Sequence, residues 1–207
     1  MLTSVSAAGD GGWTLRKDAD GIQISSRAVA GWEIHEVRGQ ARIDARLSSL
    51  VALITDESAT PELTDLVEQA EVQSRQSDTR YQVYARMKMP WPVSNRDIVN
   101  QREIVQDPRT LAVTITDSAI NGSPAPAKGY VRIVRSTQRW ILTPQADGGV
   151  LVESHILSDP AGPIPSSIVN AMSVSTPFKT LEKLRELVKR PKYAEARLGY
   201  IAEPGGA

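Results

Sequence analysis

The sequence has no cysteine, no excess charge of either sign and no long apolar run. Without cysteine, a disulfide framework, a thiolate metal site and cysteine catalysis are excluded. Lys plus Arg and Asp plus Glu number 24 each, so the net charge does not favour nucleic acid, and we expect no nucleic-acid partner. No segment approaches the roughly 20 apolar residues of a membrane-spanning helix.

The N-terminal stretch MLTSVSAAGDGGW lacks both the basic region and the apolar run of a signal peptide. We therefore expect a cytoplasmic protein, or a periplasmic or secreted one if a leader peptide was removed. The 207 residues, 41% of them hydrophobic, suit one domain with a sizeable core. We expect residues 1–12 to be a flexible N-terminus and residues 191–207 to be a C-terminal tail.

Motifs of catalysis are absent. The sequence contains no GxSxG, no HExxH and no Walker loop. His35 and His155 have no carboxylates clustered at ligand spacing, so we expect no metal, no cofactor and no catalytic residue. Glu153 and His155 would share one strand face, which is a conceivable acid/base pair but is also a common chance arrangement.

The first third of the chain changes its periodicity twice. Residues 21–29 and 32–43 are β-type runs joined by Ala30-Gly31, which predicts a hairpin. Asp44 is then a predicted N-cap for an amphipathic helix that ends at about Asp56. Thr60-Pro61 predicts the start of a second, short helix, because proline suits the first helical position.

Alternating patterns return from Leu66 and persist to residue 158. They predict strands near 67–76, 79–89, 95–106, 110–118, 130–142 and 149–158. Six consecutive strands with short connections indicate an antiparallel meander. A long helix follows over residues 164–189, and Pro177 inside it should introduce a kink. The predicted fold class is therefore α+β.

Three separated motifs carry a family resemblance. They are PWPVSNRDIV at the start of one predicted strand, GYVRI at the start of a later one, and DPAGPIPSSIVNAMSVSTPFKTLEKLR at the long helix. In this order the chain, from about Trp13 to Arg190, resembles the START family, the lipid-transfer domains related to steroidogenic acute regulatory protein. PWPVSNRD is similar to the corresponding stretch of the phosphatidylcholine-transfer members, and IPSSIVN to that of the sterol-carrying members.

The resemblance implies a START-like domain over residues 13–190 with a helix-grip fold of the START/Bet v 1-like kind. In that fold a curved antiparallel sheet wraps around a long C-terminal helix, and a hydrophobic tunnel between them holds one lipid or other apolar small molecule. It implies a structural role for Arg96 and Asp97, which tie the strand to neighbouring backbone. The proline-shaped loop matches the one beside the tunnel mouth, so Trp91 and Pro92 are a predicted gate, and a transient membrane contact is a further implication. The alternative for Trp91 is a wedge that fixes the loop on the core.

The strand before this loop has one apolar face, which a binding tunnel needs, although ordinary cores use the same residues. If Ile98 on the next strand points inward, so do Asn100 and Arg102, because alternate residues share a face. The candidate ligand-binding residues are Tyr81, Val83, Met87, Ile98, Asn100 and Arg102 on the strands and Ile168 and Met172 on the helix.

Arg102 is the most informative candidate, because a charge in an apolar interior is costly unless it is paired. Sterol-binding members carry a matching arginine near an acidic residue on the neighbouring strand, but the ungapped match to that acid here is Val83. This departure leaves Arg102 free for a ligand oxygen, and an Arg102→Met change should then weaken binding more than folding. The alternatives are a salt bridge to Glu153 or a position at the solvent-exposed rim.

Two other functions stay open on the same scaffold. One is an enzyme related to polyketide aromatase/cyclases, and the other is a protein-interaction module whose cavity is filled by its own side chains. Extraction with organic solvent followed by mass spectrometry discriminates between them, since only a carrier should copurify with stoichiometric lipid.

Overall fold

The computed structural model describes residues 12–164 and 166–205. The predicted flexible N-terminus therefore lies, apart from Gly12, outside the described residues. The strands are β1 (Thr14–Ala19), β2 (Ile22–Ala28), β3 (His35–Ile43), β4 (Val67–Ser77), β5 (Arg80–Met87), β6 (Asn95–Gln106), β7 (Val113–Ala119), β8 (Tyr130–Ile133), β9 (Arg135–Pro144) and β10 (Val150–Asp159). The helices are α1 (Leu47–Ile54), α2 (Thr60–Leu63), α3 (Ser166–Leu187) and α4 (Pro191–Ala194).

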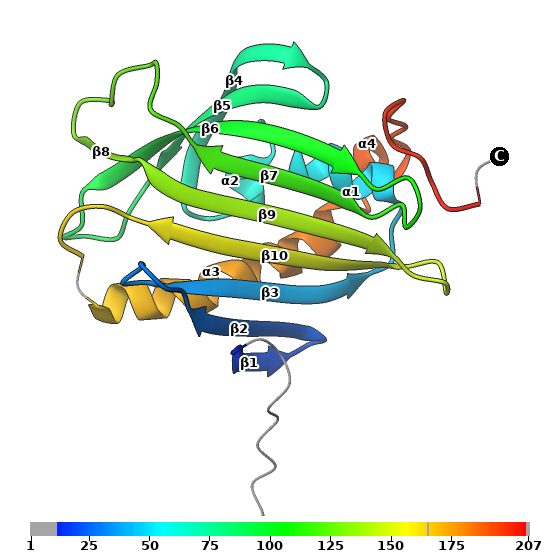
Figure 1. The fold of residues 1–207 in the computed structure, drawn as a ribbon, viewed down its shortest axis with the longest axis horizontal. Helices are drawn as coiled ribbons and strands as arrows, with labels where there is room; N and C mark the ends of the chain where they lie inside the picture. The colour runs from blue at the N-terminus through cyan, green and yellow to red at the C-terminus, as the bar shows by residue number, and fades with distance from the viewer. Residues whose placement is uncertain (1–11, 165, 206–207) are drawn as a thin grey trace, which may run out of the picture.

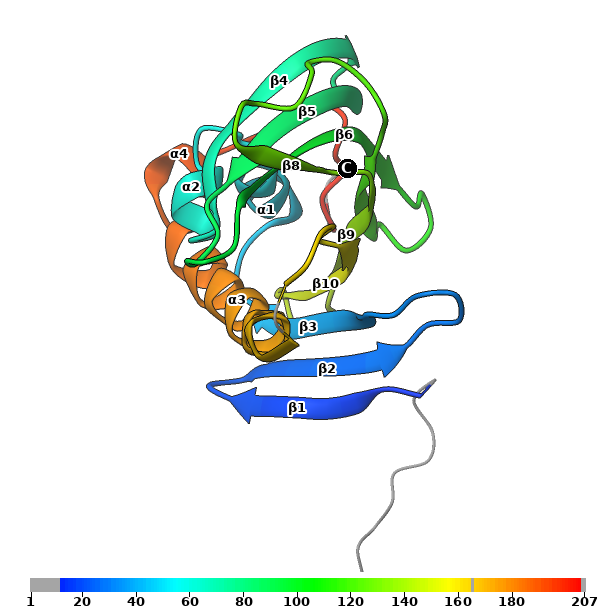
Figure 2. The same cartoon turned by 90° about the vertical axis from the view of Figure 1, so that its left-hand side faces the viewer.

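All strands belong to one sheet in the order β1-β2-β3-β10-β9-β7-β6-β5-β4, and β8 pairs with β6 beside this path. Every pairing is antiparallel except that of β8 with β6, which is parallel. The sheet is strongly curved, and the helices lie on its concave side (Figures 1 and 2). The predicted α+β fold, a curved antiparallel sheet around a C-terminal helix, is confirmed.

Two details of the predicted strand set are wrong. β1 was missed, because its sequence TLRKDA is mostly exposed and lacks a clear apolar alternation. The predicted strand over residues 130–142 is two strands separated at Val134, since β8 crosses to β6 while β9 continues between β7 and β10. The N-terminal strands join the meander through β3 and β10, which no local pattern reveals.

The predicted N-cap Asp44 is also wrong. Helix α1 begins at Leu47, after Arg46, and the carboxylate of Glu203 accepts hydrogen bonds from the backbone nitrogens of Leu47 (3.1 Å) and Ser48 (2.7 Å). A carboxylate suits a helix N-terminus because the first amides have no partner within the helix. The tail after α4 is thus fixed to the domain, and Ile201 is buried. The predicted short helix at Thr60-Pro61 is present as α2.

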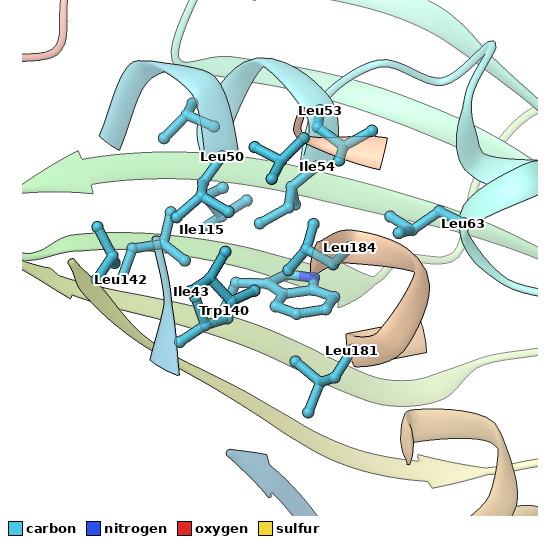
Figure 3. Packing of buried hydrophobic residues seen from close by; sticks show 14 of the residues in the cluster. Ile43, Leu50, Leu53, Ile54, Leu63, Ile115, Trp140, Leu142, Leu181 and Leu184 are labelled. Atoms are coloured by element: carbon cyan, nitrogen blue, oxygen red, sulfur yellow. The ribbon is translucent and has the colours of Figure 1, made fainter. Parts of the chain in front are cut away.

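The packed core lies where α1 and the C-terminal half of α3 meet the concave face of the sheet. Leu50, Leu53, Leu181 and Leu184 from the helices interdigitate with Trp140 and other strand residues (Figure 3). Gly39 on β3 lets helix α3 pack close to the sheet, because a β-carbon there would lie 3.0 Å from Leu181 Cδ1 and 3.3 Å from Ile24 Cδ1. In the described part of the chain, no helix combines the length and apolar character of a bilayer-crossing segment.

Candidate ligand-binding interior

The concave face of the sheet has two halves that differ in packing. In the half nearest α1, the inward-facing side chains are buried against the helices; among them are Tyr81, Val83, Ile104, Ile115, Trp140 and Leu142. Toward the other end of the same strands, inward-facing Met87, Asn100, Ala119, Gln138 and Ile156 are half-buried, whereas Ala85, Ile98 and Arg96 on the same face are buried. We call this second region the open half.

Helix α3 covers the open half only along one side. It lies against β2 and β3 and against α1 and α2. On its N-terminal half, Ile168 and Met172 are half-buried, whereas Leu181 and Leu184 further along are fully buried. The helix continues through Pro177, and the kink expected there stays a prediction. The predicted helix residues and the strand residues Met87 and Asn100 thus border the less densely packed end.

A pocket of about 400 Å³ opens at this end, between α3, the segment before β4 and the β5–β6 loop. It is lined by Asp65, Leu66, Lys88, Met89, Pro90, Met172, Ser175, Thr176 and Lys179. Two lysines and one aspartate are among these lining residues. Its volume is within the range of small-molecule pockets.

The loop beside this pocket exposes its aromatic residue. Trp91 is 91% exposed and is therefore not packed on the core, so the alternative interpretation of Trp91 as a wedge is wrong. Pro92 is exposed as well. An exposed tryptophan ring has few apolar contacts, and it would gain them in a membrane interface or against a ligand. The role of Trp91 and Pro92 as a gate stays a prediction.

Arg102 lies inside the protein but is not free, so that expectation is wrong. Its Nε and Nη2 donate to Asp117 Oδ1 (2.7 Å) and Oδ2 (2.8 Å), and its Nη1 donates to Glu57 Oε1 (2.9 Å). Glu153 and the solvent-exposed rim, the two alternatives, are not its environment. Arg102 is only 9% exposed. The acid missing at Val83 is supplied from the strand on the opposite side, because Arg102 is paired in register with Asp117 of β7.

Burial and the neighbouring charges shift the pKa values of Glu57, Tyr81 and Arg102. Burial raises the pKa of Glu57, although Arg102 opposes the shift. Burial also raises the pKa of Tyr81, whose hydroxyl lies 3.5 Å from Arg102 Nη1. For Arg102 itself, burial favours the neutral form, but the attraction of Asp117 outweighs it and raises the pKa. Two carboxylates share one cation, so most of the arginine's donors are already engaged by protein.

Arg96 and Asp97 point to opposite faces of β6. Arg96 is 2% exposed and donates to the backbone carbonyls of Ser94, Pro160 and Ala161, so it connects the start of β6 with the loop between β10 and α3. Asp97, which is fully buried, accepts hydrogen bonds from the Tyr84 hydroxyl (3.0 Å), the Ala127 backbone nitrogen (2.9 Å) and the Arg132 guanidinium (2.7 Å). These contacts connect β6 to neighbouring segments of the chain. We therefore propose that Arg96 and Asp97 stabilise the fold.

Of the remaining candidates, some lie in the packed core and one lies beside the open half. Tyr81 and Val83 belong to the packed core. Ile98 forms a separate small cluster with Ala85 and Ile133, which borders the open half. His155 faces outward: its Nδ1 is 3.4 Å from Glu36 Oε1, and burial lowers its pKa. The conceivable acid/base pair with Glu153 therefore does not face the interior.

Sequence reasoning missed Glu57 and Asp117. A tight turn at Asp107-Pro108 would not have led to Asp117, because the connection between β6 and β7 runs over residues 107–112 and pairs Gln106 with Val113. Glu57 lies in the link between α1 and α2, and no local pattern places this link over the sheet.

A curved antiparallel sheet that grips a long C-terminal helix is a helix-grip fold, and comparison with known proteins defines the family. The START domain family model matches residues 42–193, so the chain belongs to the START domain family. A crystal structure of the STAR-related lipid transfer protein from Xanthomonas axonopodis is 35% identical, with a TM-score of 0.78, and the match covers 86% of this chain and 99% of that chain.

Other relatives are more distant. A Pseudomonas aeruginosa protein described as uncharacterized is 26% identical over 86% of this chain and 87% of its own length. The Mus musculus phosphatidylcholine transfer protein is 30% identical over 48% of this chain and 48% of its own length. Human StAR-related lipid transfer protein 5 shares the fold, with a TM-score of 0.80 at 15% identity over 88% of each chain.

Proposed function

We propose that the protein is a carrier that holds one lipid or other apolar small molecule in the open half of its interior. The observation that carries the proposal is a partial contrast along single strands: inward-facing side chains near α1 are buried, whereas Met87, Asn100, Gln138 and Ile156 toward the other end are half-buried beside the buried cluster of Ala85 and Ile98. A pocket of about 400 Å³, lined by Met172 of α3 and by Lys88 and Met89 directly after β5, lies at the edge of this region and is the proposed entrance. Membership of the START domain family and the lipid-transfer names of the relatives support the same function.

The polar residues of this interior suit orientation of the ligand rather than chemistry. Asn100 and Gln138 offer neutral hydrogen-bonding groups to the open half, whereas the cation of Arg102 is engaged by two carboxylates. An apolar molecule with one or two hydroxyl, ester or amide oxygens matches this lining. The protein would thus act without a covalent step, which distinguishes it from a cyclase on the same scaffold.

The first experiment identifies the cargo and its position. Purified protein is extracted with organic solvent, and the extract is quantified by mass spectrometry. We expect about one lipid per chain, and we expect Met172→Trp, which fills the opening, to reduce the load severalfold. Val105→Trp is the matched control, since Val105 is 63% exposed on the outer face of β6. An empty extract from the wild-type protein, with no thermal shift on adding lipids, would contradict the carrier function and favour the interaction module.

Exchange with a membrane is the second part of the proposal. Trp91 and Pro92 lie beside the pocket, next to exposed Lys88, so the loop presents an amphipathic residue and a cation at the opening. Tryptophan prefers the interface between headgroups and acyl chains. Opening of this loop at a membrane surface would give the ligand its route.

A vesicle assay tests the route separately from binding. Trp91→Ala should slow transfer of the copurified lipid between phosphatidylcholine vesicles about tenfold or more while the load per chain is unchanged. Leu15→Ala is the control, because Leu15 is 55% exposed on the distant edge strand β1. Equal transfer rates for the two variants would refute the gate and leave the binding function standing.

A further inference from the structure

A second pocket, of about 510 Å³, lies at the opposite end of β5 from the pocket at Met172. It forms where the end of α1, the β4–β5 hairpin and the C-terminal tail meet. Its lining residues are Thr55, Arg75, Asp78, Tyr81, Arg197, Leu198, Gly199 and Tyr200. Four of these eight residues, 197–200, lie beyond the family match at 42–193, so this pocket depends on the tail of this chain.

Residues 197–200, which form one wall of the pocket, are held in place by contacts of the residues before and after them. Before it, Arg46 donates to the carbonyl of Ala196 at 3.0 Å, and α4 precedes it in the chain. After it, Ile201 is buried, and the side chain of Gln106 exchanges two hydrogen bonds with the backbone of Ala202, each 2.8 Å long. Because the residues on both sides are held by these contacts, residues 197–200 are an ordered part of the domain.

The two arginines of the pocket have unused donors. Arg75 reaches Asp78 only at 3.9 Å, and both side chains are exposed, so this ion pair is weak. Arg197 donates Nη1 to the carbonyls of Glu195 and Ala196 at 3.2 Å, and within the described part of the chain it forms no ion pair. Guanidinium groups with free donors bind carboxylates, sulfonates and phosphates through paired hydrogen bonds.

The aromatic residues supply the other half of the lining. Tyr81 lines the pocket but is only 2% exposed, and the guanidinium carbon of Arg75 lies over its ring, 4.3 Å from the centroid, so Tyr200 is the aromatic residue available to a ligand. Tyr200 is half-buried and packs, together with Leu198, against the main core. Flat rings beside cations favour a ligand that is itself flat and negatively charged.

We infer that this pocket binds a small aromatic anion, with Arg75 and Arg197 holding the negative group and Tyr200 contacting the ring. The inference does not depend on the lipid carrier function, because the two pockets share no residue.

Titration of the full-length protein with 1-naphthoate tests the inference, with the uncharged 1-naphthamide as the matched probe. We expect saturable naphthoate binding with backbone amide shifts at Arg75, Gly199 and Tyr200, and at least about tenfold weaker binding of the naphthamide. Arg75→Gln and Arg197→Gln should each weaken naphthoate binding about tenfold. Arg109→Gln, the same change at an exposed arginine outside the pocket, should leave it unchanged.

Three results would overturn the inference. They are equal affinity for the two probes, equal affinity in the arginine variants and the Arg109→Gln control, or amide shifts confined to residues near Met89 and Thr176 at the other pocket. The Met172→Trp variant separates the two sites, because it should keep naphthoate binding while losing lipid. Loss of naphthoate binding in that variant would place the anion in the open half.

Discussion

Arg102 and Asp117 form a bidentate ion pair inside the protein, with Nε–Oδ1 and Nη2–Oδ2 distances of 2.7 and 2.8 Å. They are directly opposed on β6 and β7, and Glu57 closes the cluster from the link between α1 and α2. The cluster therefore connects the sheet to the helical layer. A side chain that looked available to a ligand in the sequence is engaged by the protein's own carboxylates.

Replacing Arg102 with Met should therefore destabilise the fold, in contrast to the expectation from sequence. Two buried carboxylates would lose their cation, at a cost of about 3–5 kcal/mol in the free energy of unfolding. Burial already raises the pKa of Glu57, and loss of Arg102 removes the attraction that opposes this shift; a raised pKa gives stability below the ordinary value of 4.5 that is lost as the pH rises. Urea unfolding should accordingly show a larger defect at pH 7 than at pH 4.

Arg80→Met is the control for that experiment. Arg80 pairs with Glu103 at 3.0 Å, but both side chains are about half-exposed, so we expect a change of about 0–1 kcal/mol. If both variants lose the same small amount of stability, the structural role of Arg102 is refuted, and a ligand role regains its place.

Arg96→Met should loosen the connection between β10 and α3. Ala161 adopts a left-handed backbone with φ of 56°, which a residue with a β-carbon tolerates only when its surroundings hold it, and Arg96 donates to its carbonyl. Removing the guanidinium leaves three partly buried carbonyl hydrogen bonds without their donor, so we expect a loss of about 2–4 kcal/mol. Amide exchange at Ala161 and Gly162 should accelerate, whereas Arg109→Met, an exposed control, should change neither quantity.

Gly39→Val should separate α3 from the sheet. The new β-carbon would lie 3.0 Å from Leu181 Cδ1, and the two added methyl groups have no space between β3 and the helix. Overpacking of this kind costs about 1–3 kcal/mol, measurable by thermal or urea unfolding. Gly199→Val is the matched control, because no atom lies within 4 Å of a β-carbon there. Equal stabilities of the two variants would contradict the close helix–sheet contact.

Asp56 should make the attachment of the tail pH-dependent. Burial alone would raise its pKa, but hydrogen bonds from Lys192, Ser58 and Tyr193 outweigh burial and lower it to about 2. A lowered pKa means that the stabilisation is present above the ordinary value of 3.8 and is lost as the pH falls toward 2. Asp56→Asn should therefore cost up to about 2 kcal/mol at pH 6 and progressively less below pH 4.

Asp78→Asn provides the comparison, since Asp78 is 77% exposed and only 3.9 Å from Arg75. It should be nearly neutral at both pH values. A difference between wild type and Asp56→Asn that stays constant from pH 6 to pH 3 would show that the carboxylate's charge does not stabilise the tail.

The sequence by itself determined the periodicity of nearly every element. Alternation in β2 to β7 and the apolar stripe of α3 are local signals, and the motif at Pro90–Asp97 is a sequence property that indicated the START family. Neighbouring residues along the chain encode these features, so they needed no knowledge of distant contacts. The polar edge strand β1 gave no such signal, because an exposed strand does not require an apolar face.

Only the tertiary structure decided what each inward-facing residue meets. Val83 and Met87 lie on the same face of β5, yet one is buried in the core and the other borders the open half, because α1 fills only one end of the curved sheet. Arg102 pairs with Asp117 on the neighbouring strand and with Glu57, which lies 45 residues away in the chain. Glu203 caps α1 from the far end of the chain. Such pairings join segments that are remote in sequence, so their partners are set by the way the sheet closes over the helices.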